Sequence, residues 1–316
     1  MSGAEPRPRP EPVPDPHPAA AAPAMGFAAG LVRTARPRQW IKNLLVFAAP
    51  GAAGILTHGT ALGRSLVAFA IFCLAASGTY FMNDAFDRDV DRLHPDKRHR
   101  PVASGVVGRQ AAALSAALLL AGAIGLGVAL LGREFALAVG VYAGINLAYS
   151  VWLKREPVLD LAAVASGFLI RAIAGGLAVG VPLSNWFLIV ASFGSLFMVA
   201  GKRQVDHREL ELAGIGHRGA LGAYSQQFLR FIRGMSAGIA ITAYCLWAFE
   251  KASLAPRGDI YFELTIVPFV LAILRYALLL EGGAGGAPED VVLGDRTIVA
   301  LGVVWAALFA AGVYGT

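Results

Sequence analysis

The chain has 316 residues, of which 56% are hydrophobic and only 15% charged, and its formal net charge is +6. A soluble domain of this length would be nearer a quarter charged, so the composition excludes a soluble protein with a large core and predicts a polytopic membrane protein. Nucleic acid is excluded as the partner of the basic residues, because they border apolar segments and no soluble binding domain accompanies them.

The apolar segments predict an all-α fold of about nine membrane-spanning helices around a central cavity. A helix needs about 20 apolar residues to cross the hydrocarbon of a bilayer. A sliding apolar window places the spans at residues 40–56, 64–84, 110–131, 135–153, 158–180, 184–202, 231–250, 260–280 and 292–314. Residues 1–24, rich in Pro and Ala, predict a disordered cytoplasmic tail. Residues 25–316 then form a single transmembrane domain.

The segment before the first span is polar and carries Arg36-Pro37-Arg38-Gln39-Trp40-Ile41-Lys42-Asn43. Trp40 fits the headgroup depth that tryptophan favours at a membrane interface. The segment therefore has two possible roles, either as an interfacial anchor or as part of a site that Lys42 and Asn43 line. The first span itself is short and is interrupted by Pro50 and Gly51.

The second span ends in a run of acids, Asn83-Asp84-Ala85-Phe86-Asp87-Arg88-Asp89-Val90-Asp91. Charges at the rim of a bilayer are costly unless something pairs with them. An α-helix turns about 100° per residue, so side chains of the run that share one face of roughly 100° can be identified. They are Asn83, Asp84, Asp87 and Asp91, whereas Asp89 points elsewhere. Because oxygen ligands suit a hard cation, the shared face predicts a Mg²⁺ site, with Mn²⁺ as an alternative. Solvated acids paired with nearby bases are the competing interpretation.

A basic cluster, Lys97-Arg98-His99-Arg100-Pro101, follows the acidic run at once. Pro101 predicts an extended or turned backbone at Arg100. Arg donates forked hydrogen bonds to phosphate oxygens and Lys adds a point charge, so we expect Lys97 and Arg100 to bind a phosphorylated substrate. The competing interpretation is a plain topology signal.

Polar side chains also mark the fourth and fifth spans. Tyr149 and Lys154 end the fourth span on the side of the acidic run and are candidates for substrate contact, although Lys154 also fits simple snorkelling to the interface. The fifth span carries Asp160 and Arg171, which are eleven residues apart and therefore share a face. An ionisable residue within a span is a functional candidate by default, and the alternative for Arg171 is a structural pair with an acid on another helix.

The end of the sixth span mixes acids and bases. Lys202, Asp206 and Glu209 share one face, and Arg203 lies beside it. This combination predicts contact with both a metal and an anionic substrate. The alternative is an i,i+4 salt bridge on a cytoplasmic extension of the helix.

The distribution of the 27 Lys and Arg residues predicts the orientation. With the N-terminus in the cytoplasm, most of them fall in cytoplasmic segments, and the opposite side holds only Arg64, Arg133, Lys251 and Arg257. The positive-inside rule favours this orientation. The acidic run is then expected on the cytoplasmic face of the cell (plasma) membrane.

The acidic run resembles the NDxxDxxxD motif of the UbiA prenyltransferase superfamily, intramembrane enzymes usually built from nine helices around a central cavity. The resemblance covers roughly residues 33–315. Four further segments look like one branch of that superfamily, the actinobacterial decaprenyl-phosphate phosphoribosyltransferases; these segments read RPRQWIKN, SGFLIRAIAGG, FGSLFMVAGKR and PFVLAILRY. Ordinary prenyltransferases usually carry a second Asp-rich motif at the sixth span, where this chain has Lys202, Arg203 and Asp206.

The resemblance implies a Mg²⁺-dependent phosphoribosyltransferase. Its donor would be 5-phosphoribosyl 1-diphosphate, its acceptor a polyprenyl (decaprenyl) phosphate, and its product a precursor of cell-wall arabinan. The expected catalytic residues are Asp84, Asp87 and Asp91, which with Asn83 would hold the metal. The expected substrate contacts are Lys42, Asn83, Lys97, Arg100, Tyr149, Lys154, Arg171, Lys202, Arg203 and Asp206.

Two other functions fit the sequence less well. A prenyltransferase that moves an isoprenoid from its diphosphate to an aromatic or other lipid-soluble acceptor would use the same metal site but would prefer a second acidic motif. A transporter would place unwound helices near the bilayer midplane, whereas the charges here lie at helix ends. The small residues Gly175-Gly176 permit close helix packing, which is compatible with a homo-oligomer.

Overall fold

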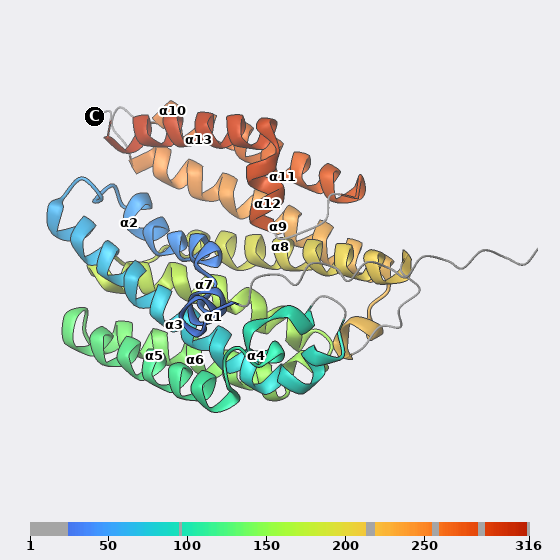
Figure 1. Cartoon of the computed structure of the whole chain (residues 1–316). Coiled ribbons are helices and arrows are strands. Elements are labelled where there is room, and N and C mark those ends of the chain that lie inside the picture. Colours follow the sequence, from blue (N-terminus) through green and yellow to red (C-terminus); the bar gives the residue numbers. More distant parts are fainter. Residues whose placement is uncertain (1–24, 95–96, 213–218, 255–258, 284–287, 315–316) are drawn as a thin grey trace, which may run out of the picture.

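The computed structural model describes residues 25–94, 97–212, 219–254, 259–283 and 288–314, and the regular elements within them are all helical. The predicted tail, residues 1–24, lies outside the described residues. The elements are α1 (Phe27–Ala35), η1 (Pro37–Phe47), α2 (Ala48–Ala52), α3 (Gly59–Arg92), η2 (Lys97–His99), α4 (Pro101–Ser104), α5 (Arg109–Leu130), α6 (Arg133–Val151), η3 (Leu153–Arg155), α7 (Leu159–Val179), α8 (Asn185–Leu212), η4 (Gly219–Ala223), α9 (Gln226–Leu254), α10 (Asp259–Leu264), α11 (Ile266–Glu281), α12 (Pro288–Gly294) and α13 (Arg296–Tyr314) (Figure 1).

Eight helices of the described chain are long and apolar enough to cross a membrane. They match the second to ninth predicted spans, which confirms the prediction of an all-helical, multi-pass membrane protein. The second span differs in length, because α3 continues as one helix to Arg92 instead of ending near residue 84. The whole acidic run therefore has helical geometry.

The first predicted span, residues 40–56, is wrong as a continuous α-helix. It consists of the eleven-residue 3₁₀-helix η1 followed by the five-residue helix α2. A 3₁₀-helix rises about 2.0 Å per residue and an α-helix about 1.5 Å, so the two rises together sum to about 30 Å, the thickness of the hydrocarbon core. The tighter winding lets a segment too short for an α-helical span cover a comparable distance.

η1 lies against α7 at a point where a side chain would not fit. A Cβ added to Gly175 would overlap the carbonyl group of Val46, which is itself fully buried. The same core includes Phe72, Phe135 and Tyr142 from α3 and α6. Gly175 of the pair that predicted close packing therefore serves an intramolecular contact between η1 and α7, whereas Gly176 faces Val181 and Leu183 just after α7.

Gly175→Ala should destabilise the protein by about 1–3 kcal/mol, because the added methyl group meets backbone that must shift. Gly140→Ala is the matched control, since Gly140 is also helical and has nothing within 4 Å of its missing Cβ. Thermal unfolding of the purified protein in detergent measures both. Equal midpoints for the two variants would contradict the close approach.

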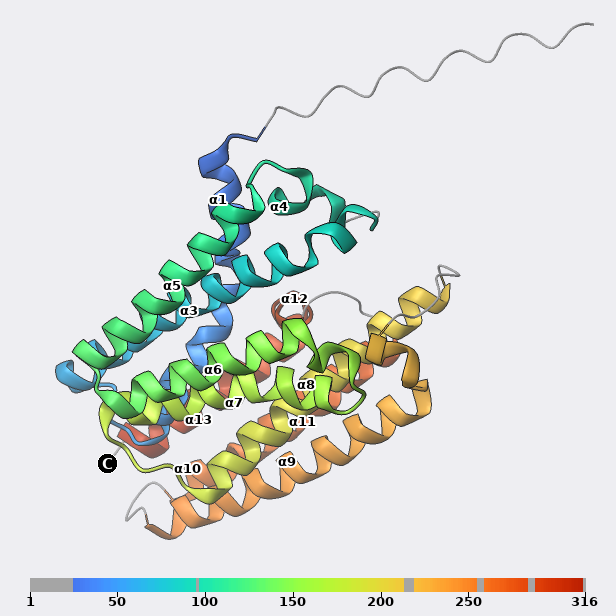
Figure 2. The same cartoon turned by 90° about the horizontal axis from the view of Figure 1, so that it is seen from below.

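The helices form a layered bundle in which α3 packs on α5 and the chain then continues through α6, α7, α8 and α9 as successive neighbours (Figures 1 and 2). The short helix α12 contacts α11 and α13, and it can be followed beside α11 in Figure 1. Val291 fixes α12 by packing with Phe197 of α8 and Tyr276 of α11. Side chains from the C-terminal ends of α3, α6 and α8 meet at one end of the bundle, and the candidate site lies there.

Candidate functional site

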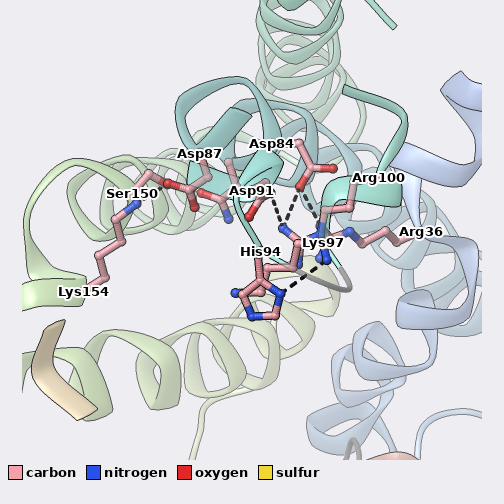
Figure 3. Close-up of polar contacts among 10 residues, drawn as sticks. Arg36, Asp84, Asp87, Asp91, His94, Lys97, Arg100, Ser150 and Lys154 are labelled. Carbon is pink, nitrogen blue, oxygen red and sulfur yellow. Dashed lines mark hydrogen bonds and ion pairs between the residues drawn. The ribbon is translucent and has the colours of Figure 1, made fainter. Parts of the chain in front are cut away.

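Two of the predicted acids face the N-terminal segment and the basic loop. Asp84 is 2% exposed, and its Oδ1 accepts a hydrogen bond from Arg36 Nη2 at 2.6 Å and lies 3.5 Å from Arg100 Nη1. The same Arg100 nitrogen donates to Asp91 Oδ2 at 2.8 Å. Arg100 thus bridges two carboxylates that lie about two helical turns apart on α3 (Figure 3).

The other two residues of the predicted face, Asn83 and Asp87, contact the end of α6 and the adjoining η3. Asp87 Oδ1 lies 2.5 Å from Lys154 Nζ, and Asn83 Oδ1 accepts a hydrogen bond from the Ser150 hydroxyl. The division follows from helical geometry, because Asp84 and Asp91 are about 20° apart around the helix and Asn83 and Asp87 about 40° apart. The predicted face is real, and it is divided between two sets of partners (Figure 3).

Asp89 lies outside this face, as the helical spacing predicts. Its carboxylate is 70% exposed, and its ion pair with Arg109 has an N–O distance of 3.7 Å. An exposed pair of this kind contributes about 0–1 kcal/mol. Lys97 is exposed beside the site on η2, and its predicted contact with substrate stays a prediction (Figure 3).

The face of α3 has the donor set of a magnesium site, three carboxylates and one amide oxygen. Among the described residues, no three His, Cys, Asp or Glu side chains converge closely enough to form a finished metal site. Each carboxylate instead has a cationic neighbour: Arg36, Arg100 or Lys154. These oxygens fit a divalent cation if the basic side chains turn toward the phosphates of an arriving substrate.

A second cluster joins α6, α7 and α8 around Arg203. Its Nη2 donates to the Tyr149 hydroxyl at 2.9 Å, and its Nε lies 3.2 Å from Asp160 Oδ2. Asp206 is 3.8 Å from Arg203 Nη1. Tyr149 contacts Arg203, and the next residue of α6, Ser150, contacts Asn83 of α3. The Arg203 cluster and the acidic face of α3 are therefore neighbours.

Asp160 has a second polar partner, a tyrosine that the sequence analysis did not identify. Asp160 is 2% exposed and accepts a hydrogen bond from the hydroxyl of Tyr224, which follows η4. The Tyr224 oxygen accepts in turn from the backbone N–H of Val158 at 2.6 Å. Val158 has φ of 70°, an outlier for a β-branched residue, and this hydrogen bond helps to hold it. Burial and the bond to Asp160 raise the pKa of Tyr224, so the phenol remains a donor.

Arg171 forms a polar network inside the bundle. Its Nε donates to Asn43 Oδ1 at 2.7 Å, its Nη1 to the Gly167 carbonyl at 2.5 Å and its Nη2 to the Tyr142 hydroxyl at 3.0 Å. The alternative of an acidic partner on another helix is not found among the described residues, and Asp160, on the same face, pairs with Arg203 instead. Arg171 ties η1 to α7 by way of Asn43, and its predicted contact with substrate stays a prediction.

The remaining predicted cations also have partners. Lys202 Nζ donates to Asp206 Oδ1 at 3.1 Å, which is the i,i+4 salt bridge named as the alternative. Lys42 donates to Gln39 at 2.5 Å and lies 3.3 Å from Glu289 Oε1 of α12. Neither contact tests whether these lysines bind substrate.

Arg36 is the main residue that the sequence analysis missed. It has φ of 53°, in the left-handed region, where the chain leaves α1, and Pro37 follows it. A residue before proline is pushed out of the helical region, so the Arg-Pro pair did indicate a break. Its guanidinium carbon lies 4.8 Å from the Tyr80 ring centroid while it binds Asp84. The sequence carried no indication of that contact, which spans 48 residues.

Comparisons with known proteins agree with this geometry. The profile of the UbiA prenyltransferase family matches residues 44–294. The chain is 43% identical over 302 residues to decaprenyl-phosphate phosphoribosyltransferase of Mycolicibacterium smegmatis, covering 92% of this chain and 95% of that protein. It is 42% identical to the protein of the same name from Corynebacterium glutamicum, covering 92% and 89%. A structure of a UbiA homolog from Archaeoglobus fulgidus bound to DMAPP and Mg²⁺ superposes with a TM-score of 0.68 at 19% identity, covering 90% of this chain and 97% of that chain.

Proposed function

This chain belongs to the UbiA prenyltransferase family, and from that premise we propose that it transfers the 5-phosphoribosyl group of 5-phosphoribosyl 1-diphosphate to a polyprenyl (decaprenyl) phosphate. The chain is a multi-pass membrane protein and a transferase. The observation that carries the choice of donor is the Arg203 cluster beside the acidic face of α3. A sugar phosphate donor has two anionic ends, and an acidic metal-binding face next to a basic cluster suits both of them.

In this proposal the acidic residues of the site hold the metal ion and the basic residues bind the phosphates of the donor. Asn83, Asp84, Asp87 and Asp91 would hold Mg²⁺, with Mn²⁺ as an alternative, and the ion when bound makes the diphosphate a better leaving group. Arg36 and Arg100 are close enough to this face to bind the diphosphate once they leave the aspartates. Arg203, fixed by Asp160 and Tyr149, is suited to the 5-phosphate.

The reaction forms one bond and breaks one bond at C1 of the ribose. An oxygen of the lipid phosphate attacks C1 while the bond from C1 to the diphosphate oxygen breaks, and diphosphate leaves with the bonding electrons. The attacking phosphate is already anionic near pH 7, so no strong general base is required. The protein contributes mainly positioning and electrostatic stabilisation.

We also propose on which face of the membrane the site lies and that the protein forms a homo-oligomer. We place the site on the cytoplasmic face of the plasma membrane, where a soluble sugar diphosphate is available, with the N-terminus on the same side. The product would supply cell-wall arabinan synthesis. A homo-oligomer in the membrane belongs to the same proposal, and the mass of the protein in lipid nanodiscs tests it.

The test of function uses purified full-length protein, Mg²⁺, a polyprenyl phosphate and radiolabelled 5-phosphoribosyl 1-diphosphate. We expect label in the lipid phase only when the acceptor and the divalent cation are both present. A parallel reaction offers a polyprenyl diphosphate and an aromatic acceptor. Prenyl transfer in that reaction, without phosphoribosyl transfer in the first, would contradict the proposal.

A further inference from the structure

Lys42 and Glu289 form an ion pair to which no residue of the acidic run belongs. Lys42 is on η1 and Glu289 on α12, and their side chains are 23% and 14% exposed. The Nζ–Oε1 distance is 3.3 Å, yet Oε1 is buried without a hydrogen-bond partner among the described residues. A carboxylate with one buried oxygen and one imperfect ionic contact is incompletely compensated for the hydration that this oxygen has lost. This ion pair is therefore one that a better anionic ligand for Lys42 can replace.

The pair borders an apolar cavity of about 480 Å³ between η1, α7, α8 and α12. Among the described residues that line the cavity, Lys42 and Glu289 carry the charges, and the others include Leu45, Phe168 and Met198. A second apolar cavity, of about 500 Å³, shares Val190 with the first and continues past α9 and α13. A long apolar space with one cation at its border matches an isoprenoid chain that ends in a phosphate.

We propose that Lys42 binds the phosphate of the lipid acceptor at the border of this cavity, and that Glu289 is the counter-ion that this phosphate replaces. The inference rests on the proposed function, because it takes the acceptor to be a lipid phosphate. Other cations near the site already have roles there, since Arg36, Arg100 and Lys154 each contact an aspartate of α3. Val291 belongs to the packed cluster that holds the body of α12, so rotation of the Glu289 side chain is enough to separate it from Lys42, which keeps its hydrogen bond to Gln39.

The test measures binding without turnover. Full-length protein in detergent, without donor or Mg²⁺, is titrated calorimetrically with farnesyl phosphate and with farnesol. Glu289→Gln keeps the shape of the side chain and removes the competing charge, so the affinity for farnesyl phosphate should rise about fivefold. The affinity for farnesol, which has no phosphate, should stay unchanged. Lys42→Met should weaken binding of the phosphate, and Glu289→Gln should have no effect in that background.

The donor is the other source of phosphate, and separate titrations distinguish it. With Mg²⁺ present, the affinity for 5-phosphoribosyl 1-diphosphate should be the same in the parent protein and in Glu289→Gln. An unchanged or weakened affinity of Glu289→Gln for farnesyl phosphate would overturn the inference, as would an equal gain for farnesol or for the donor. Failure of the proposed function would instead appear as absent phosphoribosyl transfer, which this binding test does not use.

Discussion

Replacing Asp84 with alanine should reduce phosphoribosyl transfer on the order of a thousandfold, because the variant loses a carboxylate that we propose holds the metal beside the leaving diphosphate. The protein should remain folded. Although Asp84 is buried, its partners Arg36 and Arg100 are each about one-third exposed, so both cations can regain water when the carboxylate is removed. The loss should therefore be confined to catalysis and to the Mg²⁺ requirement.

Asp89→Ala is the matched control, since Asp89 belongs to the same helix and the same acidic run but is exposed and faces away. It should keep near-normal transfer. Initial rates over a Mg²⁺ titration and the thermal unfolding midpoint are measured for both variants. Near-normal transfer by Asp84→Ala with Mg²⁺ present would refute the assignment of the α3 face, and so would equal losses in the two variants.

Helical rotation was enough to predict which acids share a face of α3, and apolar segments of sufficient length were enough to predict most of the spans. The separation of Asp89 from Asp84 and Asp91 depends on helical rotation alone, and α3 is helical throughout. The division of that face between two sets of partners depends on which segments pack beside α3. That information is tertiary, so the spacing that selected Asn83 and Asp87 did not reveal Ser150 and Lys154 as their neighbours.

The contacts that sequence reasoning missed join residues far apart in the chain. Arg36 reaches Asp84, and Glu289 reaches Lys42 from the far end of the sequence. Arg171 was predicted as a functional residue because it is a charge inside a span, and its contact with substrate stays a prediction. What the sequence did not reveal is that its nitrogens donate to three neutral oxygens, one of which is on η1. The 3₁₀ winding of η1 also depends on tertiary packing, because Gly175 of α7 gives its backbone room.

Arg203→Met should affect stability and catalysis through separate causes. The guanidinium is the cation beside Asp160, which is 2% exposed, and its removal leaves that carboxylate with the Tyr224 hydroxyl as its close partner. Breaking a buried ion pair from one side costs about 3–5 kcal/mol, so the unfolding midpoint should fall clearly. Transfer should fall on the order of a hundredfold or more, with a raised KM for the donor, because the proposed anchor of the 5-phosphate is lost.

The double variant Arg203→Met/Asp160→Asn separates the two causes. Neutralising Asp160 removes the unpaired buried charge, so most of the stability should return, whereas the anchor for the donor is still missing and transfer should stay low. Arg203→Lys keeps the charge, but a lysine cannot reproduce the contacts of the guanidinium with both Tyr149 and Asp160. This variant should therefore fold and should show a KM for the donor between those of the parent protein and Arg203→Met. If the double variant regained both stability and transfer, Arg203 would be a structural residue only, and the basic cluster would no longer argue for a phosphorylated sugar as the donor.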